Sequence, residues 1–285
     1  MYTTLISAAQ LQHLMQTQQP LMVFDCSFEL MKPAEGDAQY QQVHIAGAVR
    51  ADLDRHLSAH DRAQAVNGGR HPLPRPEVFA AWLASVGFTS AMQAVVYDRQ
   101  GSAFCGRLWW MLKWVGHEAV AVLDGGLQAW QAAGGAVASG PDPARQPSDF
   151  RAGAPRAMLA STDDVLQGLR GPGQTLIDAR APARFRGEVE PLDPVAGHIP
   201  GALNRPFGEN FGPDGRYKAP EQLRAEFLQL LAGRDPRSVV HHCGSGVSAV
   251  PNLLAMEIAG LGRAPLYAGS WSEWCASPER PVERG

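Results

Sequence analysis

The sequence has few cysteines for its length, since only four occur among 285 residues, at Cys26, Cys105, Cys243 and Cys275. They are far apart, and no two of them form a C-x-x-C pair. This spacing excludes a disulfide framework and favours free thiols in a reducing compartment. The first residues, MYTTLISAAQLQHLMQ, also lack the basic start and apolar core of a secretory signal. We therefore expect a cytoplasmic protein.

Long apolar runs and blocks of like charge are also missing. No run approaches the ~20 apolar residues that cross a bilayer, so we expect no membrane partner. The formal net charge is −3, and Lys and Arg are scattered, so we expect no nucleic acid partner. The neighbouring His241 and His242 would point to opposite faces of a strand, and no other metal-ligand spacing occurs. We expect neither a metal nor a cofactor.

What the chain does contain is an internal repeat. Four features recur in the same order, at offsets of 144 to 154 residues. The pairs are Asp25 with Asp178, His44 with His198, Asp98 with Cys243, and Trp130 with Trp274. Such regularity predicts a duplicated domain. We assign the first copy to residues 1–135 and the second to 156–285, joined by a linker at 136–155 that is rich in Gly, Pro and Ala.

Each copy alternates short apolar runs with segments of helical period. In the second copy, TLID and SVVHH read as strands, while TDDVLQGL, APEQLRAEFLQLLAG and NLLAMEIAGLG read as helices. The first copy has PEVFAAWLASVG, AVVYD and FCGRLWWMLKWVG at matching places. Strands that alternate with helices predict an α/β fold, in which each copy is a mainly parallel sheet flanked by helices.

The stretch SVVHHCGSGVSAV puts Cys243 directly after a strand and before a helix that we expect to begin near Ser248. Gly244 and Gly246 allow the backbone to curl with its N–H groups facing inward. These donors and the positive end of the helix favour an anion, here the thiolate form of the cysteine. The first copy has Asp98 at this place, and a carboxylate cannot accept sulfur. We expect only the second copy to be catalytic.

Three reaction classes use a cysteine in such a loop. A cysteine phosphatase needs an arginine six residues after the cysteine to hold phosphate, and Ala249 stands there. A papain-like protease has a different sequence around its cysteine. Sulfur transfer remains, in which the thiolate takes a sulfur atom and holds it as a persulfide.

The motifs VHIAGAV, GHIPGALN, DAR, CGSGVSA and YAGSWSEW resemble those of the two-domain sulfurtransferases of the rhodanese superfamily, across nearly the full chain. The resemblance implies tandem rhodanese-like domains, the first inactive and the second catalytic. Within the superfamily, the CGSGV loop is similar to that of the enzymes that use 3-mercaptopyruvate. Animal enzymes that use thiosulfate carry basic residues after the cysteine, where this chain has Gly244 and Ser245.

The resemblance also implies roles for single residues. Cys243 would carry the persulfide, and Arg184 in PARFRG would bind the anionic group of the donor. Ser245 in the loop, His71 in GRHPLP and Asp54 in ADLD match a serine–histidine–aspartate relay of catalytic residues. The remaining loop residues would contact the substrate; they are Gly244, Gly246, Val247 and Ser248.

One position departs from the pattern of the mercaptopyruvate enzymes. They have a second arginine in an EPR segment, where this chain reads EPLDPVAGHIPG with Leu192. Arg180, Arg186 or Arg205 would have to supply that charge. The donor thus stays open between 3-mercaptopyruvate, which we favour, and thiosulfate. A thiol, thioredoxin or cyanide would accept the sulfur. A non-enzymatic persulfide carrier or binding module, which docks a partner protein, is the alternative from another class.

Overall fold

The computed structural model describes residues 1–141, 144–171 and 173–285. Residues 142–143 of the predicted linker lie outside the described residues. The chain forms two compact units, each made of three segments. Unit 1 consists of Met1–Gln64, Pro74–Ala157 and Pro213–Tyr217. Unit 2 consists of Ala65–Leu73, Met158–Gly212 and Lys218–Gly285. A short segment from the N-terminal half of the sequence, 65–73, is therefore part of unit 2.

Unit 1 is built on a five-stranded sheet of order β1-β6-β5-β2-β4, in which every pair is parallel. Strands β3 and β7 form a separate antiparallel pair. The strands are β1 Leu5–Ile6, β2 Leu21–Asp25, β3 His44–Ile45, β4 Val49–Arg50, β5 Gln93–Tyr97, β6 Val120–Leu123 and β7 Val137–Ala138. The helices are α1 Ala8–Met15, α2 Glu35–Gln42, α3 Pro76–Ser85, α4 Cys105–Trp114 and α5 Gly126–Ala132.

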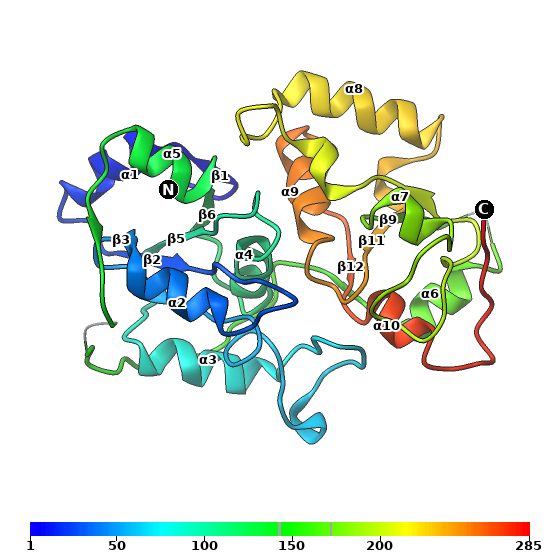
Figure 1. The fold of residues 1–285 in the computed structure, drawn as a ribbon, viewed down its shortest axis with the longest axis horizontal. Helices are drawn as coiled ribbons and strands as arrows, with labels where there is room; N and C mark the ends of the chain where they lie inside the picture. Colours follow the sequence, from blue (N-terminus) through cyan, green and yellow to red (C-terminus); the bar gives the residue numbers. More distant parts are fainter. Residues whose placement is uncertain (142–143, 172) are drawn as a thin grey trace. The chain divides into compact units, whose positions relative to one another are not determined.

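The core of unit 1 follows from the alternation of side chains along its strands. Val23 and Val95 face one way and pack with Leu11 of α1 and Trp130 of α5 in one buried cluster. Phe24 faces the other way, and its ring lies 6.0 Å from that of Trp82 in α3. Figure 1 shows α1 and α5 together on one face of the sheet and α3 on the other. Both faces are covered, which explains why these strands are apolar throughout.

Unit 2 repeats the architecture. Its sheet has the order β10-β9-β11-β12-β8, again entirely parallel. Read from β8, this is the strand order of unit 1, with β11 in the place of β5. The strands are β8 Leu159–Ala160, β9 Thr175–Asp178, β10 Leu203–Asn204, β11 Val239–His242 and β12 Leu266–Tyr267. The helices are α6 Thr162–Gly168, α7 Pro182–Phe185, α8 Pro220–Leu231, α9 Val250–Ile258 and α10 Ser270–Trp274.

The α/β fold and the predicted elements of both copies are confirmed. α6 begins with a capping box at Ser161, as its sequence indicates. α9 begins at Val250, two residues later than expected, and accommodates Pro251 in its first turn. Part of the predicted linker is ordered on unit 1, because it contains β7 and the buried side chain of Phe150.

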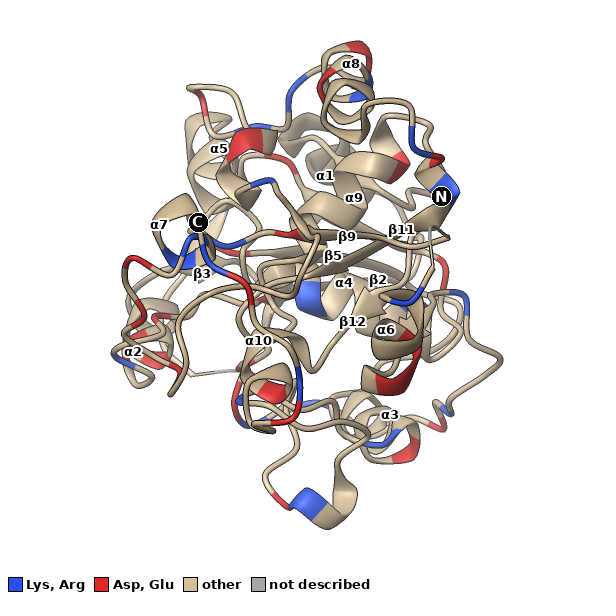
Figure 2. Ribbon diagram, turned by 90° about the vertical axis from the view of Figure 1, so that its right-hand side faces the viewer, with Lys and Arg blue, Asp and Glu red and all other residues tan. Residues whose placement is uncertain are grey.

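Charged residues of both signs are intermixed along the helices and loops (Figure 2). Of the helices in the described part of the chain, none is long and apolar enough to cross a bilayer.

Candidate active site

Cys243 directly follows β11, at the carboxyl edge of the unit 2 sheet. β11 lies between β9 and β12, so the residue stands at the middle of this edge. Its side chain is only 1% exposed. In open parallel sheets, substrates bind beyond the carboxyl ends of the central strands. The fold therefore places the Cys243 thiol at the edge of the sheet where ligands bind in this kind of fold.

The residues after Cys243 form a tight loop, which we call the Cys243 loop (243–250). The backbone reverses at Gly246, whose φ is +72°. A side chain at Gly246 would collide with the carbonyl oxygen of Ala268, so glycine is required there. Val247 is buried, and its carbonyl accepts a hydrogen bond from the N–H of Val250 at 3.2 Å. Ser248 is partly buried just before α9.

The backbone of Cys243 is fixed on both sides by the start of α10. Its N–H donates to Ser270 Oγ at 3.1 Å, and its carbonyl accepts from the N–H of Trp271 at 3.0 Å. Ser270 has a φ of +53°, a left-handed conformation that costs energy for a residue with a side chain. Strain of this kind persists where surrounding bonds enforce it. The cysteine is thus held in one backbone geometry.

Ser245 and His71 are in hydrogen-bond contact. Ser245 Oγ lies 2.7 Å from His71 Nδ1, and both side chains are 7% exposed. His71 comes from the segment 65–73 of unit 2, which approaches α10 closely at Gly69. There φ is +90°, and a methyl group would lie 2.7 Å from Ser272 Oγ. Two of the three predicted relay residues therefore meet within unit 2.

Asp54, the third predicted relay residue, belongs to unit 1. Its N–H donates to Asp52 Oδ1 at 3.0 Å. Burial, and then the negative charge of Asp52, raise the pKa of the Asp54 carboxyl above its ordinary value. Its place in a relay with His71 stays a prediction.

Arg184 lies at the end of α7 and faces the Cys243 loop. Its Nε and Nη2 donate to the Glu190 carboxylate at 3.2 and 2.7 Å, and Nη2 also reaches Asp193 at 3.3 Å. A methyl group placed on Gly244 would lie 3.4 Å from Arg184 Nη1. The guanidinium is therefore next to the residue that follows the cysteine.

Arg70 is a second arginine at this place, and it was not among the site residues predicted from the sequence. The same methyl group on Gly244 would lie 3.0 Å from Arg70 Nη2. Arg70 also forms an ion pair with Asp193. The one signal in the sequence is its position next to His71 in GRHPLP. The position of Arg70 next to His71 indicates a site residue only when the segment 65–73 is known to pack in unit 2.

The three arginines considered as a replacement at Leu192 each pair with a carboxylate, and Arg180 shares Glu190 with Arg184. Arg180 is buried and pairs with Asp178 at 2.6 Å; burial alone would lower its pKa, but this carboxylate raises it. Arg186 is largely exposed and pairs with the carboxylate two residues further on. Arg205 pairs with the carboxylate of α8 at 2.8 Å. What separates them from Arg70 and Arg184 is that none of the three supplies the atoms nearest to a side chain at Gly244.

The histidines before the cysteine are completely buried. Burial lowers the pKa of His241 to about 3, and it also lowers the pKa of His242. His241 Nε2 lies 3.0 Å from the sulfur of Met256. Both rings are neutral at neutral pH and belong to the interior of the sheet.

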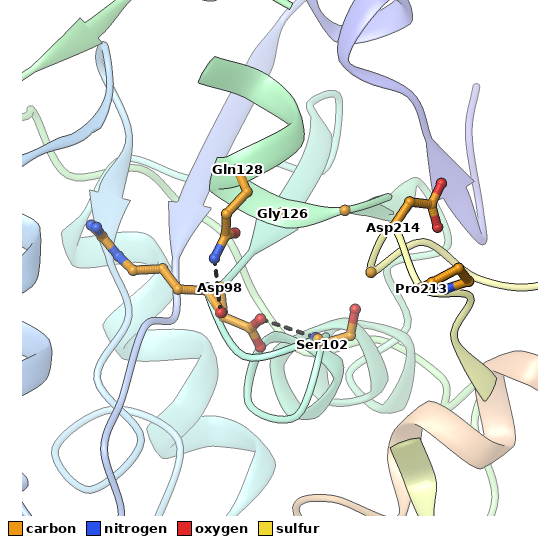
Figure 3. A pocket seen from close by; sticks show the side chains of 10 residues that line it. Asp98, Ser102, Gly126, Gln128, Pro213 and Asp214 are labelled. Atoms are coloured by element: carbon orange, nitrogen blue, oxygen red, sulfur yellow. Dashed lines mark hydrogen bonds between the residues drawn. The ribbon is translucent and has the colours of Figure 1, made fainter. Parts of the chain in front are cut away.

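Unit 1 has a counterpart loop after β5, the Asp98 loop (98–105). The Asp98 carboxylate, 1% exposed, accepts four backbone hydrogen bonds of 2.9 to 3.0 Å. We call these four N–H groups the anion cradle; they belong to Gln100, Ser102, Phe104 and Cys105. A pocket of about 290 Å³ borders this loop (Figure 3). In it, Asp98 turns toward Ser102 and away from Asp214 on the far wall.

The sequence profile of the rhodanese-like domain matches the chain twice, at residues 7–133 and 161–277. A probable 3-mercaptopyruvate sulfurtransferase of Pseudomonas aeruginosa is 50% identical over 93% of both chains. A putative thiosulfate sulfurtransferase of Mycobacterium tuberculosis, SseB, is 39% identical over 99% of this chain and 97% of its own. The crystal structure of SseA from Escherichia coli, described as a 3-mercaptopyruvate sulfotransferase, superposes with a TM-score of 0.79. It is 33% identical, and the match covers 95% of this chain and 100% of SseA.

Proposed function

The chain belongs to the rhodanese-like family, with two copies of the domain, and on that premise we propose that it is a sulfurtransferase that uses 3-mercaptopyruvate. It would move a sulfane sulfur through a persulfide on Cys243 to a thiol or cyanide. Three relatives, at 50%, 36% and 36% identity, carry the name of that enzyme, the first as a probable one.

The observation that carries this proposal is the anion cradle of the Asp98 loop. The Cys243 loop has the same place in a sheet of the same order. Each loop turns at a glycine with positive φ, +63° at Gly101 and +72° at Gly246. The carbonyl of Asp98 accepts from the N–H of Leu127 at 3.2 Å, as that of Cys243 does from α10. A loop of this shape surrounds an anion with N–H groups, and a persulfide at Cys243 would be that anion, held by the loop N–H groups other than that of Val250, which donates to Val247.

In the first step, the Cys243 thiolate attacks the thiol sulfur of 3-mercaptopyruvate. A sulfur–sulfur bond forms, the carbon–sulfur bond breaks, and its electron pair goes to the carbon that becomes the enolate. The thiol proton ends on that carbon, so that pyruvate leaves and the enzyme holds a persulfide anion. Atoms and charge balance without an added oxidant or reductant.

Ser245 and His71 would manage the proton in this step. The 2.7 Å contact between Ser245 Oγ and His71 Nδ1 lets the hydroxyl pass or receive a proton through the imidazole. Asp54 would complete the relay by holding the charge that His71 acquires. The loop residues Gly244 and Gly246 would keep the space above the sulfur open for the donor.

In the second step, an acceptor attacks the outer sulfur and releases the Cys243 thiolate. A small thiol, thioredoxin or cyanide would serve, and each leaves with one sulfur more. We propose the cytoplasm as the location, because four free and widely spaced cysteines are typical of a reducing compartment.

Thiosulfate is the second candidate donor, favoured by Leu192 in place of the second arginine and by the name of the Mycobacterium relative. We rank it lower because Gly244 and Ser245 are uncharged, and the cations beside Gly244, those of Arg70 and Arg184, are planar guanidinium forks that suit a carboxylate. A persulfide carrier without turnover is the third reading.

The test is steady-state sulfur transfer to cyanide from each donor, with wild type and Cys243→Ser. We expect 3-mercaptopyruvate to have the higher kcat/KM and the serine variant to be inactive. A higher kcat/KM for thiosulfate would reverse the choice of donor. Full turnover by Cys243→Ser would reject the mechanism, and no turnover with any donor would favour the carrier.

A further inference from the structure

Arg70 and Arg184 are linked by one buried carboxylate. Arg70 Nη1 and Arg184 Nη2 both donate to Asp193, which is 3% exposed. Two guanidinium groups this close would repel each other without an anion between them. The Asp193 carboxylate therefore fixes the position of both side chains relative to each other.

The other ends of the two guanidinium groups point to the Cys243 loop. Arg70 Nη2 and Arg184 Nη1 lie 3.0 and 3.4 Å from the place of a methyl group on Gly244. Within the described residues, no acceptor takes a hydrogen bond from either of these nitrogens. Each guanidinium carries five N–H groups, so its bond to Asp193 leaves others for a ligand. Two donors thus converge beside the residue after Cys243.

Gly244 is what keeps this space open. A carbon atom 3.0 Å from a guanidinium nitrogen is closer than ordinary van der Waals contact, so a side chain there would push Arg70 away. A carboxylate oxygen, in contrast, accepts a hydrogen bond from such a nitrogen at about 2.8 Å. Because Gly244 has no side chain, both guanidinium groups keep their place and can donate to a carboxylate in the space beside the loop.

We propose that Arg70 is the second arm of a carboxylate clamp, in which Arg70 Nη2 and Arg184 Nη1 hold the carboxylate of the sulfur donor over Gly244. Asp193 is the positioning residue behind the clamp. This inference rests on the proposed sulfurtransferase function. It assigns to Arg70 the role of the second arginine, whose place in the sequence is taken by Leu192.

The charges beside the clamp explain how it would select its ligand. Arg70, Arg184 and the neighbouring Arg180 are balanced by three carboxylates, those of Asp193, Glu190 and Asp178. The site therefore has no excess positive charge to attract every anion alike. Recognition depends instead on the planar fork of N–H groups, which suits a carboxylate. The effect of Arg70 should therefore be seen with a donor that carries a carboxylate.

The experiment compares two donors in Arg70→Gln and Arg70→Lys. One donor is 3-mercaptopyruvate, and the other is 1-mercapto-2-propanone, which has a methyl group in place of the carboxylate. We expect Arg70→Gln to lose about 30-fold in kcat/KM for 3-mercaptopyruvate, mainly through KM, because a charge-assisted bond is lost. With 1-mercapto-2-propanone we expect a change of less than about twofold. Arg70→Lys should fall between wild type and Arg70→Gln, since it keeps the charge but not the fork.

Arg186→Gln is the matched control, because Arg186 has its own exposed ion pair, and we expect it to behave as wild type with both donors. Equal losses with both donors would overturn the clamp, as would an unchanged KM for 3-mercaptopyruvate. If Arg70→Gln does not fold, the same donor comparison in Arg70→Lys decides.

Pyruvate binding, measured by calorimetry, separates this inference from the proposed function. We expect Arg70→Gln to weaken pyruvate binding by a factor similar to its loss in kcat/KM for 3-mercaptopyruvate. This measurement does not depend on turnover. A wild-type protein that transfers no sulfur would reject the sulfurtransferase proposal. Pyruvate affinity that is absent in wild type, or unchanged in Arg70→Gln, would reject the clamp.

Discussion

The Asp98 loop and the Cys243 loop follow equivalent strands, β5 and β11, of two sheets that have the same strand order. The residues at their centres nevertheless differ in chemistry. In unit 1, the Asp98 carboxylate fills the anion cradle with hydrogen bonds from four N–H groups. In unit 2, the same position carries a thiol. The Asp98 carboxylate already accepts four hydrogen bonds and cannot form a bond to sulfur, whereas a thiolate can. The N–H groups around the carboxylate are seen in unit 1, and the residue at the centre of the loop distinguishes the two units.

The surroundings of the loops differ as well. The Cys243 loop has Arg184 beside Gly244 and is lined by the segment 65–73, which brings His71 to Ser245. In the Asp98 loop, Arg99 occupies the position of Gly244, and it donates to the carbonyl of Gln39 and the hydroxyl of Ser27 instead of facing a ligand. The two loops thus differ in their neighbours as well as in their central residue.

The largest effect is expected from making the second loop like the first, with Cys243→Asp. Sulfur transfer should fall by at least about 10³-fold, since a carboxylate cannot form a persulfide. The variant should unfold at a higher urea concentration than Cys243→Ser, because its carboxylate can accept the N–H groups of the loop. An aspartate variant that is less stable than the serine variant would contradict the likeness of the two loops.

In unit 1, Asp98→Ala removes the carboxylate from the anion cradle. Four buried N–H groups lose their acceptor, so we expect a loss of about 3 kcal/mol in the free energy of unfolding, measured with urea. Asp98→Asn, which keeps an acceptor oxygen, should lose less. At a temperature well below unfolding, both variants should transfer sulfur as wild type does. A stability equal to wild type in Asp98→Ala would show that the cradle is not structural.

A matched pair of glycine variants sharpens the comparison further. Gly246→Ala should lower kcat/KM about 30-fold, because the methyl group collides with the Ala268 carbonyl and moves the loop by about 1 Å. Gly101→Ala, at the same place in unit 1, should cost about 1 kcal/mol of stability through its positive φ and leave activity unchanged. Steady-state kinetics and urea unfolding check the pair. Equal kinetic losses would mean that both loops serve the reaction.

The smallest effect is expected at the hydroxyl of the active loop. Ser245→Ala removes the partner of His71 and should lower kcat about 10-fold with little change in KM, as for the loss of a proton-transfer group. Gln100→Ala, at the equivalent position of the Asp98 loop, serves as the control and should transfer sulfur at the wild-type rate. A kcat that Ser245→Ala leaves unchanged would remove Ser245 from the mechanism.

The fold was predictable from the sequence because its signals are local and are repeated. The apolar runs that form β5 and β11 and the capping box at Ser161 stand out without knowledge of the tertiary structure. The sequence does not determine the first residue of α9, because a helix that follows a loop with two glycines can begin at several residues. Val250 is the first helical residue, and Ala249 before it offers no side-chain cap.

The site was predictable only in part. Cys243 and its glycines are neighbours in the sequence, so their local pattern predicts a loop. Arg70 could not be found in this way, because its contact with Gly244 depends on where the segment 65–73 packs. That packing needs the close approach of Gly69 to Ser272, which no local pattern indicates.

The most direct test of the central claim is the mass of the protein after incubation with 3-mercaptopyruvate, followed by peptide mapping without reductant. We predict a gain of one sulfur atom on the peptide that contains Cys243, and none on the peptides of Cys26, Cys105 and Cys275. Sulfur on one of these other cysteines, or no gain on Cys243 while pyruvate is released, would contradict the account.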